Sequence, residues 1–466
     1  MRSASLCLLP ALMLTGCSLA PDYAPPVTAA PAAYKEIPAG WTTATPLDAA
    51  PRGAWWTMFG DPMLDGLEAR IESASPTLAA AVARYDAARA SAGEASADLY
   101  PTVGVSGDAV RERTSGRRPG ATRSATYTDA TIGGSLAYEI DLWGRVRNSV
   151  RAADASAEAS AADLQSVRLS LQASVADAYF RLRGLDAEAA LLRKTVEAFG
   201  RALELTQARH DGGAASGLDV SRAQTQLSDA RAQISDVANR RAATEHEIAA
   251  LVGLLPSELS LPPSDAGIGA PPPMPIDTPA SLVQRRPDVA AAERRIAAAN
   301  ARIGVARAAF FPSLTLGGTA GFEAAQGSLL SSPASFWALG PLTAALDLFD
   351  GGRRRARVRI SRAEYDEAAA NYREAVLTAF RETEDQLAAA RLLAAQARDQ
   401  RDAAAAARRT SDLAFTRYRE GASDYLDVVT AQTAALDAQR AEIAVQTLRV
   451  RTAVALVRAL GGSSTG

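Results

Sequence analysis

Apolar residues recur at alternating steps of four and three along two long stretches of the chain. The first stretch, Asn148 to Arg209, contains no proline, and the second, Arg353 to Glu420, contains neither glycine nor proline. A heptad spacing held over this many residues is typical of long helices that pack against other helices. We therefore predict helices at 147–209 and 353–420, each roughly 90 to 100 Å long. No compact domain could contain helices of that length.

Shorter helical patterns flank the two long ones. They cover residues 62–99, 218–251, 288–309 and 422–460. Each half of the chain thus supplies a short helix, a region of different pattern, a long helix and a further helix. We assign the first repeat to residues 61–255 and the second to residues 287–460.

The region between each short helix and the following long helix alternates between apolar and polar residues. Such alternation is clear in Ile132–Leu142, Leu314–Phe322 and Leu342–Leu348, and it predicts strand pairs within 101–143 and 312–349. One face of these strands is apolar and the other carries hydroxyls and carboxylates. That pattern suits a strand of about 9 to 11 residues between lipid and water, and the alternative is a half-buried strand of a soluble sheet.

Two polar stretches, 111–124 and 323–335, are predicted as long loops that join the strands of each pair on the outer face.

Sequence motifs return after roughly 210 residues. The segment Arg209–Val220 returns as Arg417–Val428, and Tyr100-Pro101 returns as Phe311-Pro312. Solenoid repeats are much shorter, about 20 to 50 residues, so the pattern indicates a tandem duplication of a whole structural unit. Two strands per repeat give four per chain, whereas single-chain membrane barrels begin at about eight. We therefore expect several copies to share one barrel, since open strand edges must be paired.

The N-terminus resembles a bacterial lipoprotein signal. Arg2 precedes a short apolar run, Leu6 to Leu14, and Leu14-Thr15-Gly16-Cys17 resembles a lipobox. We predict removal of residues 1–16 and acylation of Cys17, with Ser18 favouring the outer membrane. An ordinary secretory signal with an incidental cysteine is the alternative. Beyond this covalent lipid no cofactor is expected.

Composition narrows the function further. The formal net charge is −2 and the pI is near 6.0, so nucleic acid is not an expected partner. Two Cys and two His leave no pattern for a disulfide or a metal site, and no catalytic motif indicates an enzyme. The mature chain lacks an apolar run of about 18 residues, so any membrane crossing is expected from strands.

Five arginines open the second long helix, where positive charge opposes the helix dipole. Anionic headgroups of the inner leaflet and a solvated face are equal explanations for them. These residues are Arg353, Arg354, Arg355, Arg357 and Arg359.

Four motifs together resemble one known family. They are Trp55–Pro62, Gln284–Arg294, Ala298–Pro312 and Ala459–Gly462. In this order they resemble the outer-membrane factors of tripartite efflux systems, the TolC-like and OprM-like channels, and especially their NodT-type lipoprotein branch. The resemblance covers nearly the whole mature chain.

The resemblance implies a mainly α fold with a membrane β-barrel portion. A homotrimer would form a twelve-stranded outer-membrane barrel, four strands per chain, on an α-helical periplasmic tunnel. An equatorial belt would come from residues 17–60, the Pro-rich linker 256–286 and the tail 461–466. The implied partners are a periplasmic membrane-fusion adaptor and an inner-membrane RND-type pump, with no reaction catalysed.

Gly213 and Gly421 stand where each long helix should stop and reverse, a usual role of glycine. The resemblance makes these hairpins, with Asp219, the adaptor-contacting ends of a closed gate, in which Asp427 would form an acidic ring and Tyr418 a closing contact. Other gate positions of the family fall on Ser423 and Thr430, which depart from its pattern. Arg417 and Asp424 are candidate substitutes.

For Asp427, a carboxylate that stabilises the first turn of a helix is an equal explanation, and its duplicate Asp219 supports that reading.

The leading hypothesis is a passive exit channel for small molecules such as drugs. A type I protein-secretion channel and a lipid-anchored periplasmic coiled-coil scaffold without a pore are the alternatives.

Overall fold

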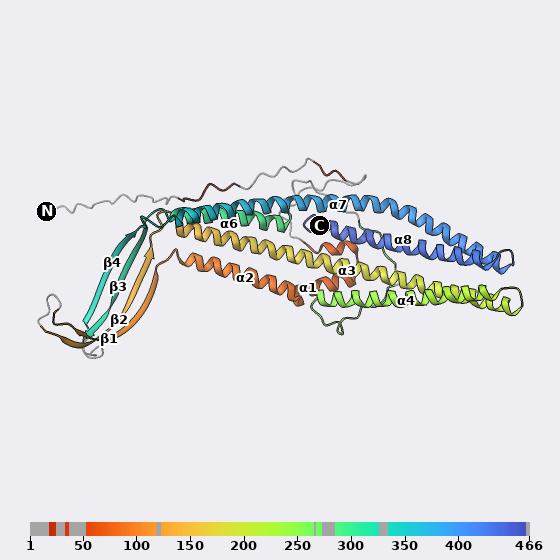
Figure 1. Ribbon diagram of the computed structural model, residues 1–466, viewed down its shortest axis with the longest axis horizontal. Coiled ribbons are helices and arrows are strands. Elements are labelled where there is room, and N and C mark those ends of the chain that lie inside the picture. The colour runs from red at the N-terminus through yellow and green to blue at the C-terminus, as the bar shows by residue number, and fades with distance from the viewer. Residues whose placement is uncertain are drawn as a thin grey trace, which may run out of the picture. The chain divides into compact units, whose positions relative to one another are not determined.

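The computed structural model describes most of the chain, and the elements follow the duplicated order (Figure 1). The described residues are 18–24, 33–36, 53–117, 123–264, 267–272, 285–325 and 334–462. Cys17, the predicted signal peptide 1–16, the tail beyond Gly462, and much of 17–60 and of the Pro-rich linker 256–286 lie outside these ranges.

The first repeat contains four helices and two strands after a short 3-10 helix, η1 (Trp55–Phe59). They are α1 (Pro62–Ala74), α2 (Pro76–Ala97), β1 (Thr102–Thr114), β2 (Ala125–Glu139), α3 (Arg145–Asp211) and α4 (Gly217–Leu251). Within the described residues, the second repeat has equivalents of α2, β1, β2, α3 and α4. They are α6 (Pro287–Ala308), β3 (Ser313–Ala325), β4 (Ala334–Ala345), α7 (Arg353–Arg419) and α8 (Tyr425–Ala459).

Equivalent helices of the two repeats have equal lengths. Both α3 and α7 contain 67 residues, α4 and α8 contain 35, and α2 and α6 contain 22. At 1.5 Å per residue the long helices measure roughly 100 Å along their axes. The predicted long helices and the duplication are confirmed.

The chain forms two compact units, and each takes residues from both repeats. One contains residues 1–27, 85–160 and 291–372, and the other contains residues 28–84, 161–290 and 373–466. The first unit contains the sheet, and the second contains α4, α8 and the far ends of α3 and α7.

The four strands form one antiparallel sheet in the order β1-β2-β3-β4 (Figure 1). The central pair, β2 and β3, joins the two repeats. Register places the apolar positions of neighbouring strands opposite one another, as in Val103 with Leu136 and Ile132 with Phe322. The result is one continuous apolar face, on which Trp337 and Leu339 of β4 are also exposed. The opposite face carries Asp108, Thr131 and Glu323 in register.

Several boundaries differ from the sequence predictions. The predicted helix 62–99 is two helices, because Pro76 lacks an N–H and disfavours helical geometry at Ser75, which is extended. The strand predicted at 342–348 ends at Ala345, which pairs with Ser313. The residue before Ser313 is Pro312, which cannot donate a further ladder hydrogen bond.

The loops are shorter than predicted at 111–124 and 323–335. Residues 111–114 continue β1, where Arg111 pairs with Thr128, and residues 323–325 continue β3. Charged side chains at the strand ends were therefore misassigned to loops. The helix predicted at 422–460 begins at Tyr425, because residues 421–424 form the turn and the cap.

No helix within the described ranges has both the length and the apolar character needed to cross a membrane.

The motif around Trp55 organises packing in the second unit. Trp55 is buried and its indole Nε1 lies 3.4 Å from Gln172 Oε1. Asp61 caps α1 by accepting from the backbone N–H groups of Met63 and Leu64, and it also accepts a hydrogen bond from the Tyr179 hydroxyl. The tryptophan and the Asp-Pro pair therefore fix the start of α1 against α3.

A buried arginine ties α6 to the C-terminal part of the second repeat. The Arg286 guanidinium donates to Asp288 at 2.6 Å and to Glu382 at 2.8 Å, and it also donates to the carbonyl oxygen of Ala459. Burial alone would lower the pKa of the Arg286 guanidinium, but its hydrogen bonds to Asp288 and Glu382 raise this pKa above the usual value. The motif at residues 285–288 thus has a structural role.

Glu68 is a buried carboxyl of the second unit. It lies on α1 and is 1% exposed, and neither carboxylate oxygen has a hydrogen-bond partner among the described residues. Burial, with smaller contributions from the charges of Asp65 and Glu72, raises the pKa of Glu68 to about 9. Glu68 is therefore protonated at neutral pH.

Replacing Glu68 by Gln should stabilise the protein at alkaline pH. The unfolded chain loses the Glu68 proton near the ordinary pKa of 4.5, whereas the folded chain keeps it until about pH 9. The contribution of Glu68 to the stability of the folded state is therefore complete below pH 4.5, and it is lost as the pH rises from 4.5 to about 9. We expect the thermal unfolding midpoint of Glu68→Gln to exceed that of wild type near pH 8 but to match it near pH 5.

Glu72→Gln is the control, because Glu72 is paired with Arg168 at 2.9 Å. The same pH-dependent gain in both variants would contradict the assignment.

Candidate functional site: hairpin ends and strand–helix junction

The two long helices end in the same turn. Gly213 and Gly421 both have positive φ, +74° and +79°. In the first hairpin the Gly213 N–H donates to His210 O and the Ala214 N–H donates to Arg209 O. In the second hairpin the Gly421 N–H donates to Tyr418 O at 2.9 Å, and the Ala422 N–H donates to Arg417 O at 2.8 Å. This pair of hydrogen bonds is the Schellman motif, so the predicted role of both glycines is confirmed.

The residues after each turn cap the next helix, and the two repeats differ here. In the first hairpin Ser216 and Asp219 form a capping box, and the Asp219 carboxylate accepts from the Ser216 hydroxyl at 2.7 Å. It also pairs with Arg222. Asp219 therefore serves its own hairpin.

Asp427, the duplicate of Asp219, has a free carboxylate. In the second hairpin Asp424 takes the capping role by accepting from the Asp427 N–H at 3.2 Å. Asp427 is exposed, and no side chain in the described part of the chain binds its carboxylate. Of the two duplicates, Asp219 is bound within its own hairpin, whereas the Asp427 carboxylate has no side-chain partner among the described residues.

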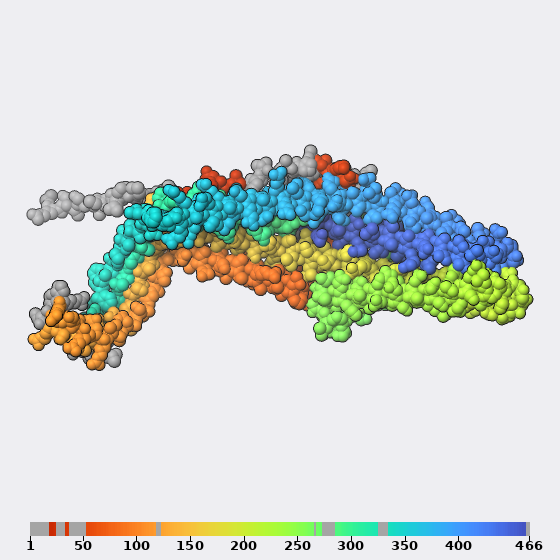
Figure 2. Space-filling view, viewed as in Figure 1, coloured from red at the N-terminus to blue at the C-terminus, as the bar shows by residue number. Residues whose placement is uncertain are grey.

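The two hairpins lie side by side (Figure 2) and are joined by a buried aromatic cluster. Tyr418 is 3% exposed, and its hydroxyl donates to Thr206 Oγ1 at 3.2 Å. Its ring packs edge-on against Tyr425 at 5.2 Å between centroids. The hydroxyl of Tyr425 lies 3.4 Å from Gln226 Oε1, and burial raises the pKa of Tyr425 to about 12.

Arg209 connects the first hairpin to this cluster. Its guanidinium lies 4.6 Å from the centroid of the Tyr418 ring, and Nη1 donates to the Tyr418 carbonyl oxygen. The equivalent residue, Arg417, instead reaches the carbonyl oxygen of Ala422 in its own turn, at 3.4 Å. The structure thus brings Tyr418 together with Arg209, whereas Arg417, Asp424 and Asp427 lie outside the cluster.

Sequence reasoning missed Arg209 and Thr206 as partners of Tyr418. Arg209 stood in the repeated motif, but the motif gave no sign that the two arginines would act differently.

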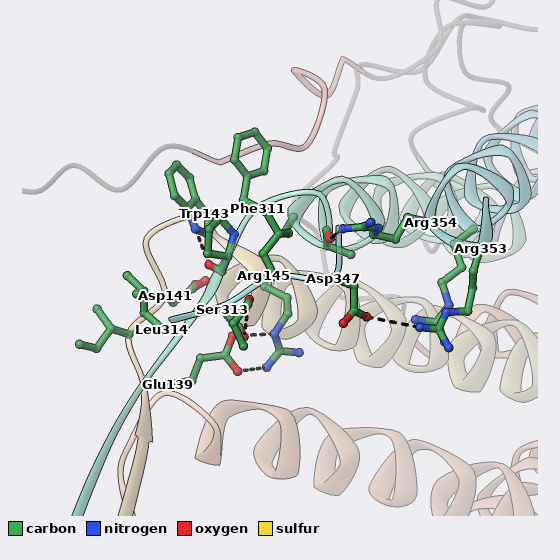
Figure 3. A pocket seen from close by; sticks show the side chains of 17 residues that line it. Glu139, Asp141, Trp143, Arg145, Phe311, Ser313, Leu314, Asp347, Arg353 and Arg354 are labelled. Carbon is green, nitrogen blue, oxygen red and sulfur yellow. Dashed lines mark hydrogen bonds and ion pairs between the residues drawn. The ribbon is translucent and has the colours of Figure 1, made fainter. Parts of the chain in front are cut away.

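A polar cluster lies at the end of the sheet where the long helices begin (Figure 3). Arg145 donates to Glu139 through two hydrogen bonds of 2.7 and 2.6 Å. Trp143 stacks on Phe311 at 4.7 Å, and its Nε1 donates to Pro312 O. These residues line a cavity of about 260 Å³ beside the sheet.

Carboxylates at this end compensate some of the helix-opening arginines. Burial alone would raise the pKa of Asp141, but the backbone and side-chain hydrogen bonds from Arg147 hold it below its usual value. In the second repeat the backbone N–H groups of Arg354 and Gly352, with the Arg354 side chain, lower the pKa of Asp350 to about 2. Arg354 is therefore paired with Asp350, with 2.7 Å between Nε and Oδ2. Arg147 is paired with Asp141 in the same way.

A sheet with one apolar face and two unpaired edges, followed by long helices that reverse in paired hairpins, defines a subunit of a membrane channel whose wall is shared between copies. The chain belongs to the family of outer membrane efflux proteins. The family model described as "Outer membrane efflux protein" matches residues 69–254 and again residues 278–462, which is one match for each repeat.

Characterised relatives support this assignment. The chain is 34% identical to the antibiotic efflux pump outer membrane protein ArpC of Pseudomonas putida over 457 residues, 97% of this chain and 94% of that protein. It is also 34% identical to the pyoverdine export outer membrane protein OpmQ of Pseudomonas putida over 470 residues, 98% and 97% of the two chains.

Among solved structures, the outer-membrane channel OprN superposes with a TM-score of 0.89 at 34% identity, covering 96% of this chain and 99% of that one.

The family settles the class of function. Its members are passive outer-membrane channels, not enzymes, and they form trimers that work with periplasmic adaptors and inner-membrane pumps. The protein is accordingly an outer-membrane channel of a tripartite efflux system, with a tunnel that extends into the periplasm. The predicted fold class and location are confirmed, and the hypothesis of a scaffold without a pore is wrong.

Proposed function

We propose that this protein is the lipid-anchored exit channel for small organic molecules delivered by an RND-type inner-membrane pump. Relatives that match almost the whole chain are named for antibiotic efflux and for pyoverdine export. No relative described above is named for protein secretion, which disfavours the type I secretion alternative. Because the pump selects what enters the channel, substrate identity follows from the pump that this channel serves.

The course of residues 18–24 supports acylation of Cys17. The Ser18 hydroxyl donates to Asn148 Oδ1 at 3.0 Å, and Asn148 lies in the first turn of α3. Farther on, the Leu19 carbonyl oxygen accepts from Arg307, and the Pro21 carbonyl oxygen accepts from Asn300 at 2.8 Å. These contacts hold the residue after Cys17 at the sheet end of α3, where acyl chains on Cys17 would meet the membrane.

Close packing reinforces this course. A Cβ at Gly304 of α6 would lie 2.8 Å from the backbone nitrogen of Ala20 and 2.6 Å from Asn148 Nδ2. Only glycine leaves space for the segment at this point of α6.

The proposed gate combines the free carboxylate of Asp427 with the hairpin packing around Tyr418. In a trimer, three copies of Asp427 would place three negative charges at one level of the pore. Such a ring favours cations and restricts flow. The Arg209–Tyr418 contact would keep the hairpins packed together, and Gly213, Asp219 and Gly421 would shape the ends that the adaptor meets.

Purification from the native host tests the proposed partners. The tagged channel, cross-linked in cells, should co-purify with a periplasmic adaptor and an RND-type pump, and its deletion should sensitise cells to small organic toxicants. Recovery of an ATP-driven exporter with a secreted protein, together with unchanged sensitivity, would contradict the proposal.

Mass spectrometry of the N-terminal peptide tests the lipid anchor. Wild type should begin at an acylated Cys17, and Cys17→Ala should lack the acyl mass yet retain trimers, because the barrel itself holds the protein in the membrane. Cys7→Ala is the matched control, since Cys7 lies in the removed signal. An unmodified Cys17 in wild type would overturn the proposed acylation.

Conductance in planar bilayers tests the gate. Asp427→Asn should raise single-channel conductance and reduce cation selectivity, measured from reversal potentials in a salt gradient. Asp219→Asn removes the same charge from the duplicate position, where the carboxylate is held by Ser216 and Arg222. Equal effects of the two substitutions, or none from Asp427→Asn, would remove Asp427 from the gate.

A further inference from the structure

The first turns of α7 carry uncompensated positive charge on the side of the sheet where the helices begin. We call Arg353, Arg355, Arg357 and Arg359 the basic collar; all four are exposed. Arg353 lies 3.5 Å from Asp347, and both of these side chains are largely solvated. For the other three, the described part of the chain offers no carboxylate within ion-pair distance. The neighbouring Arg354 differs, because it is held by Asp350.

Among the described residues, the solvated Arg353–Asp347 contact is the one ion pair that offsets this arrangement. A cation near a helix N-terminus opposes the helix dipole, and like charges four residues apart repel one another. In the first repeat, Arg145 and Arg147 at the start of α3 are paired with Glu139 and Asp141, and Arg151 lies against the side chains of Ser18 and Asn148. Most of the helix-opening arginines without a carboxylate partner therefore belong to the second repeat.

Exposed apolar side chains lie next to the collar. Leu348 and Phe349, between β4 and α7, are each 91% exposed. Aromatic and aliphatic side chains beside cations at the end of a membrane strand are typical of the boundary between acyl chains and headgroups. The helices continue into the periplasm, so this boundary belongs to the periplasmic leaflet.

The four arginines point in different directions around the helix. This favours contact with a layer of lipid headgroups rather than with the surface of a second protein. Two residues turn a helix by roughly 200°, so Arg353 and Arg357 point to one side and Arg355 and Arg359 to another. A helix–helix contact would place its charges in one stripe along the axis. The collar instead spans about 9 Å of the axis, similar to the roughly 5 to 8 Å of headgroup region on one side of a bilayer.

We propose that the basic collar binds the phosphates of anionic phospholipids, such as phosphatidylglycerol or cardiolipin, in the periplasmic leaflet. The arginine stems lie along the acyl boundary while the guanidinium groups reach the phosphates. Leu348 and Phe349 contact the adjoining acyl chains. The proposal rests on the outer-membrane location of the sheet, and in a trimer it gives three equivalent lipid sites.

Native mass spectrometry of delipidated trimers, titrated with phosphatidylglycerol or phosphatidylcholine, tests the collar. Wild type should prefer phosphatidylglycerol, and the triple variant Arg355→Gln, Arg357→Gln, Arg359→Gln should weaken that preference by roughly 100-fold, given about 1 kcal/mol for each of the three cations removed at an anionic surface. The control Arg398→Gln, Arg408→Gln, Arg409→Gln removes three exposed charges from the same helix and should retain the preference. Equal behaviour of the two triple variants would overturn the proposal.

Four further measurements separate the alternatives. Wild-type preference should fall as salt is raised, and a salt-independent preference would count against the collar even if the variant failed to fold. Competition by inorganic phosphate as effective as that by phosphatidylglycerol would indicate a simple anion site and would also overturn it. Dissociation of the collar variant into protomers, with the control still trimeric, would show that the arginines bind a second copy instead. Normal single-channel conductance of the collar variant would show that channel function is independent of the collar.

Discussion

Inside a bilayer the backbone N–H and C=O groups of a strand have no water to bind, so each must find another strand. In this protein β2 and β3 are paired on both edges, whereas β1 and β4 are each paired on one. Four strands cannot close into a cylinder of the known sizes, so the free edges of β1 and β4 require the corresponding edges of other copies. The trimer of this family is thus a condition for a stable sheet in the membrane.

Duplication of one structural unit supplies all four strands of this sheet and allows the two repeats to diverge. Equivalent helices keep equal lengths, and the pairing of β2 with β3 joins one repeat to the other. The differences lie at the two ends of the long helices. At the hairpins Asp219 is bound within its capping box while Asp427 is free. At the sheet, Arg145 is neutralised while most of the basic collar is not. One copy of each part thus preserves the fold, and the other is available for function.

The sequence predicted the features that depend on local pattern. Heptad spacing located the long helices, alternation located the strands, and Gly213 and Gly421 marked both reversals. Features set by contacts between distant residues were less accessible. The break at Ser75 depended on a single proline within an otherwise helical pattern. The end of β4 depended on Pro312, which precedes the neighbouring strand β3 and is far from the end of β4 in the sequence. The contact of Arg209 with Tyr418 depended on how two hairpins lie side by side, which no local pattern encodes.

The construction of the hairpins has a consequence for how such channels diversify. Each reversal is held by backbone hydrogen bonds and by the positive φ of one glycine, while its outermost side chains, such as those of Ala214 and Ala422, contribute little to the turn. Substitutions at those positions can therefore alter the surface offered to a periplasmic protein while the duct keeps its shape. During evolution, a channel can in this way come to fit a different periplasmic partner through substitution of a few exposed side chains.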